Sequence, residues 1–375
     1  MNIGIPAETR AGETRVAATP ETVKKLAAGG RHAILVQSGA GVAASVPDRD
    51  FEAAGAKIVA EAKDLSIADI VLKVRGPQDG EVGLFKRGAI LIGLLNPYDR
   101  ATMESYAAAG LTCFAMEWLP RTTRAQGMDV LSSQANIGGY KAVILAAAEY
   151  GRFMPMLMTA AGTVKAARVL VLGAGVAGLQ AIATAKRLGA VIEASDVRPA
   201  VKEQIESLGA KFLDVPYLTD EEREIAQGVG GYARPMPVDW MRRQAELVHE
   251  RAKAADIVIT TALIPGRPAP VLLREETVKA MKPGSVVVDM AIEQGGNCPL
   301  TEKDKIVVKH GVKLVGLANL PALVAADASA LYARNLLNFL NLLVDPKTGE
   351  LKLNREDEII AGSLVCINGE VVKKS

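Results

Sequence analysis

The sequence predicts an α/β fold made of two doubly wound domains, the second inserted into a discontinuous first. Three observations lead to this prediction. At 375 residues the chain is too long for one compact core. Two separate stretches alternate short apolar runs with helical segments, which indicates parallel strands covered by helices. The second stretch opens on a complete Gly-x-Gly-x-x-Gly turn at residues 173–178.

The first stretch covers residues 1 to 117, and apolar runs of strand length recur through it. The expected strands are NIGIP at 2–6, HAILVQ at 32–37, AKIVA at 56–60, DIVLKV at 69–74, AILIGLL at 89–95 and LTCFAME at 111–117. The expected helices between them are 20–30, which opens with Pro20 and closes in a glycine pair, then 49–55 and 101–110. A polar loop at 120–126 and a long helix at 128–151 follow.

The second stretch begins at Arg168. Its expected strands are RVLVLG at 168–173, AVIEASD at 190–196, KFLDV at 211–215, DIVITTA at 256–262, SVVVDMA at 285–291 and KLVGL at 313–317. Helices are expected at 176–188, 200–208, 239–255, 275–281 and 321–343, and the segment 351–372 alternates as a strand would. The last stretch of the chain returns most economically to the first domain. The expected domains are therefore 1–132 with 316–375, and 133–315.

Composition excludes several classes of protein. A net charge of +2, without a run of five like charges, argues against a nucleic-acid partner. Cys113, Cys298 and Cys366 stand far apart without metal-ligand spacing, so we expect reduced thiols and no metal. The chain starts directly with a strand-like run, and no apolar run reaches the ~18 residues of a membrane span. These features predict a soluble, cytoplasmic chain without a signal peptide.

The glycine turn predicts a dinucleotide site in a Rossmann-like domain, because an uncharged strand precedes it and a helix follows it. Gly173 permits the tight turn, Gly175 lets a pyrophosphate approach the backbone, and Gly178 lets helix and strand pack closely. The helix beginning at Val176 offers free N–H groups to the phosphates. A similar Gly-x-Gly-x-x-Ala run at 39–44 is read as a turn only, because Pro47 prevents a helix from starting where the phosphates need one.

Asp196 ends the next strand, 23 residues after Gly173. A carboxylate there accepts from the adenosine ribose and repels a 2′-phosphate, so the cofactor is expected to be NAD(H) rather than NADP(H). Arg198, two residues further on, is a signal in the opposite direction. We give it less weight because the acidic residue holds the strand-end position itself.

The nicotinamide ring is expected at the carboxyl ends of the second set of strands, in a cleft facing the first domain. Its walls would be Thr260–Leu263 and Asp289–Gly296. The polar loop Arg121–Asp129 reads either as an ordinary solvated loop or, near such a cleft, as a group that orients a carboxamide or ribose. The three histidines, His32, His249 and His310, have no catalytic context. Hydride transfer between two nicotinamides moves no hydroxyl or amine proton, so it needs no protein acid or base.

Four long runs resemble the proton-translocating nicotinamide nucleotide transhydrogenase family, in its NAD(H)-binding component, domain I. They are PRTTRAQGMDVLSSQANIGGYKAV, MTAAGTVKAARVLVLGAGVAGLQAIATAKRLGA, TTALIPGRPAPVL and MKPGSVVVDMAIEQGGNCPL, and the resemblance covers essentially the whole chain. It implies a homodimer on the cytoplasmic side of the membrane that exchanges hydride with NADP(H) on a separate domain III of the β subunit. A membrane domain would couple this exchange to proton movement.

The resemblance also implies roles for individual residues. The catalytic loop that meets the nicotinamide ring and ribose falls on Arg121, Gln126, Asp129 and Ser132. The cofactor-binding positions fall on Thr122, Thr123, Arg124, Gly173, Gly175, Val176, Gly178, Asp196, Val197, Arg198, Gln244 and Leu263. A mobile loop that closes over the nucleotide falls on Gly230–Ala233, with Gly231 and Tyr232 as its contacts.

Two other functions stay open at this point. Alanine dehydrogenase is similar in fold, and Arg15 with Lys73–Arg75 would suit an amino-acid carboxylate. Against it, the catalytic histidine of that enzyme's FLHLA-like run is replaced by Asn96, and the aspartate of its VDIAIDQGG-like run by Glu293. An NAD sensor would need no ring-facing polar loop, so Gln126 disfavours it.

The chain stops at Ser375, where the fused bacterial forms of the α subunit continue into membrane helices. We therefore expect the split arrangement, with membrane helices and domain III on separate polypeptides. The chain would then associate peripherally with the inner membrane through its partners. The Met-rich run 153–159 is the expected dimer contact.

Overall fold

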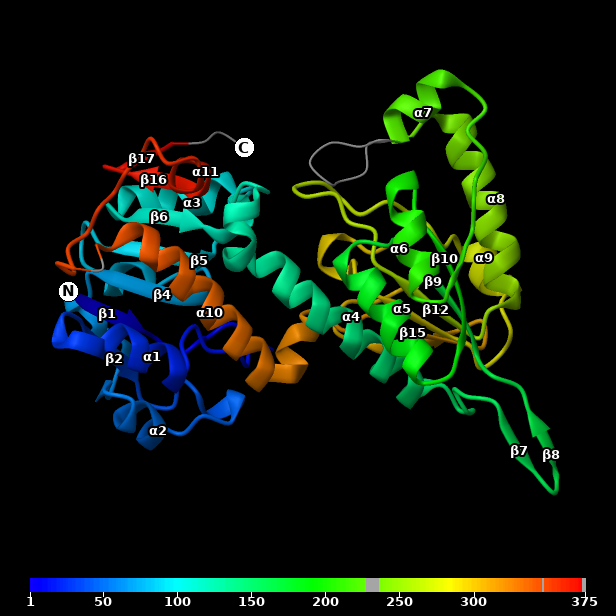
Figure 1. Ribbon diagram of the computed structural model, residues 1–375, viewed down its shortest axis with the longest axis horizontal. Helices are drawn as coiled ribbons and strands as arrows, with labels where there is room; N and C mark the ends of the chain where they lie inside the picture. The colour runs from blue at the N-terminus through cyan, green and yellow to red at the C-terminus, as the bar shows by residue number, and fades with distance from the viewer. Residues whose placement is uncertain (227–235, 346, 373–375) are drawn as a thin grey trace. The chain divides into compact units, whose positions relative to one another are not determined.

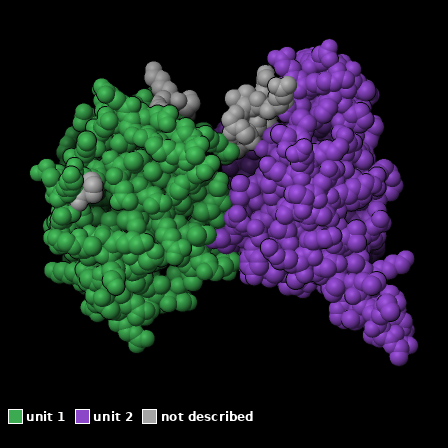
Figure 2. Space-filling view, viewed as in Figure 1, with its two compact units in different colours: residues 1–134, 321–375 green, residues 135–320 purple. Residues whose placement is uncertain are grey.

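The computed structural model describes residues 1–226, 236–345 and 347–372. The expected mobile loop, Gly230 to Ala233 with Gly231 and Tyr232, lies outside the described residues. The chain divides into two compact units, residues 1–134 with 321–375 and residues 135–320, coloured separately in Figure 2. The predicted α/β class, with parallel Rossmann-like sheets, is confirmed.

Unit 1 is built on an eight-stranded sheet in the order β17-β16-β6-β5-β4-β1-β2-β3. Strands β1 to β6 are parallel, and the last two run antiparallel to their neighbours. Their bounds are β1 Asn2–Ile5, β2 Ala33–Gln37, β3 Lys57–Val59, β4 Ile70–Arg75, β5 Ile90–Leu94, β6 Thr112–Ala115, β16 Leu364–Ile367 and β17 Glu370–Val371. The helices are α1 Pro20–Ala27, α2 Asp48–Ala53, α3 Arg100–Ala108, α10 Ala325–Leu343 and α11 Glu358–Ser363.

Alternation along the strands feeds two cores, one on each face of the sheet. Ile92 belongs to the core that also contains Phe339 of α10, whereas Leu91 belongs to the core with Met103 of α3. Adjacent side chains of a strand point to opposite faces, so parallel strands covered on both sides read as continuous apolar runs. This burial explains why the six expected strands of unit 1 were recognisable.

Unit 2 holds a seven-stranded sheet in the order β11-β10-β9-β12-β13-β15-β14, parallel except for β14. The strands are β9 Arg168–Leu172, β10 Val191–Ser195, β11 Lys211–Phe212, β12 Ile257–Thr260, β13 Val286–Asp289, β14 Ile306–Lys309 and β15 Val312–Val315. The helices are α4 Val130–Glu149 (whose first residues belong to unit 1), α5 Val176–Arg187, α6 Lys202–Ser207, α7 Asp220–Ala226, α8 Val238–Ala254 and α9 Glu275–Ala280. Counted along the parallel strands, the order is that of dinucleotide-binding sheets, with the switch point beside β9.

Three segments differ from the sequence prediction. The run before β9 forms a hairpin, β7 Leu157–Thr159 with β8 Gly162–Val164, which projects from unit 2 as a separate sheet (Figure 1). β14 pairs antiparallel with β15 and was not expected. The segment 351–372 is strand-like only at its end, because Asp357 accepts from the N–H groups of Ile359 and Ile360 and begins α11.

The other glycine run, 39–44, is a turn as predicted. Gly39 has φ of 79°, a short 3-10 turn covers Val42–Ala44, and α2 begins only at Asp48. Among the described residues, no helix combines the length and apolar character needed to span a membrane.

Candidate functional site

The glycine turn joins β9 to α5, and each glycine has its own steric reason. Gly173 has φ of 97°, and a Cβ on it would lie 2.7 Å from Oγ1 of Thr261. A Cβ on Gly178 would lie 1.9 Å from the carbonyl oxygen of Gly173. Gly175 is different, because no atom of the described residues lies within 4 Å of the position its Cβ would take. The turn is therefore packed on one side and open over Gly175, where a pyrophosphate could approach the first N–H groups of α5.

Asp196 follows β10, and its side chain is only 6% exposed. Oδ2 accepts from the N–H of Ala174 in the glycine turn at 2.8 Å. The Arg198 guanidinium donates to both carboxylate oxygens, from Nε at 2.9 Å and Nη2 at 2.8 Å. This pairing raises the pKa of Arg198. Asp196, which favours NAD(H), and Arg198, which is a signal for NADP(H), thus form one ion pair. This pair is hydrogen-bonded to the glycine turn through Ala174.

The segment after Asp196 is fixed to α8. The Tyr217 hydroxyl donates to the carbonyl of Val197 at 2.8 Å, and its ring stacks on Trp240 of α8 with centroids 6.1 Å apart. Gln244 lies one turn beyond Trp240 on the same helix and is half-buried. Val197 and the helix that carries Gln244 are therefore connected through one aromatic pair.

The loop after β12 borders the glycine turn. Thr261 Oγ1 donates to the carbonyl of Gly173 at 2.9 Å, and Leu263 is 40% exposed. The loop after β13 is organised by Asp289, which is 1% exposed. The sequence predicts the segments 260–263 and 289–296 as walls of the site. It gives no sign that the Thr260 hydroxyl donates a hydrogen bond to Asp289 at 3.1 Å and so joins the two segments.

The predicted ring-facing loop lies in unit 1, mostly in a 3-10 helix, Thr123–Met128. Gln126 is exposed, and its amide has no hydrogen-bond partner among the described residues. Asp129 accepts from the N–H of Ser132 at 2.9 Å and from its hydroxyl, which fixes the first turn of α4. Arg124 pairs with Asp357 at 2.7 Å.

The same loop is fastened to α10 through its backbone. The carbonyl of Gly127 accepts from the side-chain amides of Asn335 and Asn338, each at 2.8 Å. Thr123 is exposed, and the Thr122 hydroxyl is buried without a partner in the described portion of the chain. Arg121 is exposed at the start of the loop. Hydrogen bonds from α10 therefore fix the backbone of the loop next to Gln126, while the Gln126 side chain is exposed.

Arg15 and Lys73, the cations that would suit a carboxylate substrate, are almost fully buried and paired. Arg15 donates to both oxygens of Glu13 at 2.7 Å and to Oε1 of Gln134 at 2.8 Å. Lys73 Nζ lies 3.5 Å from a carboxylate oxygen of both Glu8 and Glu81. Internal carboxylates thus already neutralise both cations.

The histidines and cysteines take structural or surface roles. His249 Nδ1 lies 3.0 Å from Oγ1 of Thr277, and His310 Nε2 lies 3.4 Å from a carboxylate oxygen of Glu275. All three cysteines are free and buried. Within the described ranges, no group of three or more His, Cys, Asp or Glu side chains could hold a metal ion.

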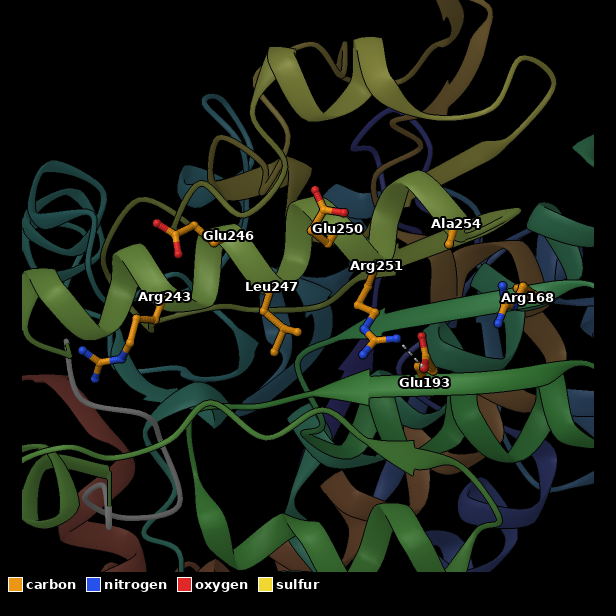
Figure 3. Close-up of a pocket in the computed structure, with 8 residues that line it drawn as sticks. All are labelled: Arg168, Glu193, Arg243, Glu246, Leu247, Glu250, Arg251 and Ala254. Atoms are coloured by element: carbon orange, nitrogen blue, oxygen red, sulfur yellow. Dashed lines mark ion pairs between the residues drawn. The ribbon is translucent and has the colours of Figure 1, made fainter.

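A groove of about 520 Å³ runs along α8 of unit 2. Leu247 and Arg251 point from α8 toward the strands, and Arg251 Nη1 lies 3.5 Å from Oε1 of Glu193 (Figure 3). Three arginines of its lining are matched by three glutamates. Because its charges balance and it reaches Arg168, at the end of β9 away from the glycine turn, we do not assign the nucleotide to it.

Comparison with known proteins gives consistent matches over the whole chain. The family model of the alanine dehydrogenase/PNT N-terminal domain matches residues 4–138, and that of the alanine dehydrogenase/PNT C-terminal domain matches residues 142–374. The first of the parts that make up NAD(P) transhydrogenase subunit alpha in Rhodospirillum rubrum is 54% identical over 379 residues, 99% of this chain and 98% of its own length. Alanine dehydrogenase of Mycobacterium tuberculosis is 32% identical over 331 residues, 86% of this chain and 82% of its own.

Solved structures give the same order of similarity. The transhydrogenase from Sinorhizobium meliloti superposes with a TM-score of 0.89 at 48% identity, covering 99% of this chain and 100% of that one. An L-alanine dehydrogenase superposes with a TM-score of 0.81 at 25% identity, covering 99% and 97%. The resemblance drawn from the sequence runs is confirmed.

Proposed function

The chain belongs to the NAD(P) transhydrogenase α-subunit family, and from this premise we propose that it is the NAD(H)-binding component of a proton-translocating transhydrogenase. It exchanges hydride between NAD(H) held here and NADP(H) held by domain III of the β subunit. Separate membrane-spanning chains couple the exchange to proton translocation. The chain works as a homodimer on the cytoplasmic side of the inner membrane.

The observation that carries the proposal is the open glycine turn, with Asp196 bonded to its backbone. The space over Gly175 is a cradle that a Cβ would fill, so the residues present fit a bound dinucleotide. The turn from Gly173 to Gly178, including Val176, would hold the pyrophosphate, and Asp196 to Arg198 the adenosine ribose. Gln244 and Leu263 complete the pocket, Leu263 from the segment Thr260–Leu263 that is expected beside the nicotinamide ring.

Roles on the nicotinamide side follow from the family resemblance. Arg121, Gln126, Asp129 and Ser132 orient the ring and its ribose, with Thr122 to Arg124 beside them. When bound, the nicotinamide ring supplies the hydride. The protein supplies only orientation, because no proton has to move with the hydride between two such rings.

The alternative, an alanine-dehydrogenase-like enzyme, needs a proton carrier and a free cation for the substrate carboxylate. Asn96 cannot titrate near neutral pH, and its backbone N–H is held by Glu117 at 2.7 Å. Arg15 and Lys73 are paired to carboxylates inside unit 1. These features favour hydride exchange over the oxidation of an amino acid.

The test mixes the purified chain with NADH deuterated at the transferring position and an NADP⁺-loaded domain III. Deuterium should appear in NADPH, measured by mass spectrometry, and only when both proteins are present. A second arm gives the chain NADH, pyruvate and ammonia, where no turnover above background is expected. Sustained NADH oxidation in that arm, without transfer in the first, would establish the dehydrogenase instead.

A further inference from the structure

Asn297 lies in the loop after β13, with its side chain fully buried. Its amide bonds to both backbone polar atoms of one residue in the neighbouring loop. Oδ1 accepts from the N–H of Ala262 at 3.2 Å, and Nδ2 donates to the carbonyl of Ala262 at 2.9 Å. Nδ2 also donates to the carbonyl of Pro270 at 2.7 Å. The side chain therefore pairs with Ala262 as an adjacent β-strand would.

The backbone of Asn297 is fixed as well. Its N–H donates to Asp289 at 3.1 Å, and its carbonyl accepts from the N–H groups of Leu272 and Leu273. Asp289 also accepts from the Thr260 hydroxyl at 3.1 Å and from two further N–H groups of its own loop. The loops after β12 and β13 are thus joined into one hydrogen-bonded body with Asn297 at its centre.

This body ends on the proposed nucleotide site. Ala262 stands between Thr261, which donates to the carbonyl of Gly173, and Leu263, which is partly exposed. A Cβ on Gly173 would come within 3.1 Å of the N–H nitrogen of Ala262. A shift of Ala262 would therefore move both the wall of the glycine turn and the side chain of Leu263.

We propose that Asn297 is a positioning residue for the nicotinamide half of the bound nucleotide. It touches no part of NAD(H) itself and acts by holding Thr261 to Leu263 in place. This inference rests on the proposed function, because it assumes that Leu263 meets that half. An amide is required, since it alone offers an acceptor to one N–H and two donors to two carbonyls.

The experiment compares Asn297→Asp and Asn297→Ala with wild type and with Ser285→Ala. Aspartate keeps the shape but turns a carboxylate oxygen toward the two carbonyls, and alanine leaves all three backbone groups unpaired. Ser285 is a matched control, being 1% exposed and bonded to the carbonyl of Lys282, but at the amino end of β13. Thermal melting checks that each variant is folded.

Three quantities are measured: affinity for NADH, affinity for ADP-ribose, and the rate of deuterium transfer to domain III. We expect the Asn297 variants to bind ADP-ribose within about twofold of wild type and to transfer about 10- to 100-fold more slowly, because small misplacements of the ring are costly in rate. The preference for NADH over ADP-ribose should shrink. Ser285→Ala should leave all three quantities unchanged.

Equal losses for NADH and ADP-ribose, or an unchanged rate in folded Asn297→Asp, would overturn the proposal. If neither Asn297 variant folds, Leu263→Ala decides, since it alters the exposed end of the same segment. An unchanged NADH-to-ADP-ribose ratio in that variant would equally overturn it. Failure of transfer in wild type would refute the proposed function instead, and the two affinities would still judge Asn297 on the chain alone.

Discussion

At the residue scale, the Asp196 carboxylate accepts hydrogen bonds from both the glycine turn and Arg198. Both of its oxygens accept from Arg198, and one also accepts from Ala174. A ribose hydroxyl that reaches Asp196 must therefore share or displace the guanidinium. If Asp196 holds the adenosine ribose as proposed, discrimination against a 2′-phosphate would depend on the carboxylate keeping Arg198 paired, because a released guanidinium would bind phosphate well.

Asp196→Asn should therefore weaken NADH binding and reduce the preference for NADH over NADPH by about tenfold or more. Hydrogen bonds to charged groups contribute about 1.5–3 kcal/mol, and tenfold in affinity corresponds to about 1.4 kcal/mol. Fluorescence titration with both nucleotides measures the ratio. Asp214→Asn, which changes an exposed carboxylate after β11, is the control. An unaltered ratio in Asp196→Asn would contradict the assigned role.

Gln126→Asn should separate nucleotide binding from hydride transfer. The exposed amide can orient the ring without titrating, whereas the pyrophosphate and adenosine contacts are expected to supply most of the affinity. Shortening the side chain should slow transfer about 100-fold while NADH affinity stays nearly intact. Stopped-flow rates against equilibrium affinity give the comparison. Parallel losses would mean that Gln126 only helps to hold the nucleotide.

At the scale of elements, the turn between β9 and α5 allows two glycines to be tested against each other. Gly175 has φ of −72°, and the described residues leave open space at its Cβ position, so Gly175→Ala should fold as stably as wild type. Its methyl group would occupy the pyrophosphate approach and lower NADH affinity at least about tenfold. Gly178→Ala should instead destabilise the fold, by about 1–3 kcal/mol or more, because its methyl meets the backbone. Calorimetry measures the stability of both variants, and titration measures their affinity for NADH. A loss of stability in Gly175→Ala would contradict the prediction.

Helices α1 and α10 are joined by Glu21, which accepts from Arg334 at 2.6 Å and from Lys25 at 2.8 Å. These hydrogen bonds lower the pKa of Glu21 from 4.5 to about 2. The pairing therefore stabilises the fold fully above pH 4.5, and the stabilisation is lost as pH falls through about 2. Glu21→Gln should lower the urea midpoint slightly at neutral pH, and the difference should vanish near pH 2. The control is Glu52→Gln, an exposed change on α2. Any difference between its urea midpoint and that of wild type should not disappear as the pH falls.

Which elements could be predicted from the sequence depended on burial. The strands β9, β12 and β13 are covered on both faces and read as apolar runs. The β7–β8 hairpin is exposed and β14 carries alternating exposed residues, so neither showed a buried pattern. α11 is started by Asp357, a capping signal inside a segment whose alternation favoured a strand.

The tight geometry of the glycine turn and the position of Asp196 directly after a strand were predictable because both are local in sequence. The hydrogen bonds that hold the proposed site together are not local. Arg124 meets Asp357, 233 positions away, and Asn297 meets Ala262 across 35 positions. Only the fold brings such groups together, and an asparagine in a loop carries no signal of the backbone it will pair with.

At the scale of the whole molecule, the exposed hairpin bears on assembly. Phe153, Met156 and Met158 are 54%, 60% and 71% exposed, in or next to a sheet that has only two strands within the described part of the chain. An isolated hairpin is at best marginally stable in water, and an exposed apolar run commonly marks an interface. We expect a second copy of the chain to cover this segment.

Analytical ultracentrifugation should therefore find a dimer at micromolar concentration, and Met158→Lys should shift it toward monomer. The control is Val308→Lys, which changes a residue of similar exposure, 65%, on the edge strand β14. A monomeric wild type, or a dimer insensitive to Met158→Lys, would exclude the hairpin as the contact.

The sheet of unit 1 has a consequence for the order in which a ribosome can complete the protein. Its core includes Tyr332, Leu336 and Phe339 of α10, and its edge is finished by β16 and β17, all made after the whole of unit 2. Residues 135–320 form an uninterrupted unit and have every strand of their sheet before α10 is synthesised. The amino-terminal strands, although made first, keep apolar surface uncovered until the carboxyl-terminal segment emerges. During synthesis, unit 2 is therefore the first that can close its core, and the amino-terminal part of unit 1 can complete its core only after the carboxyl-terminal segment has been made.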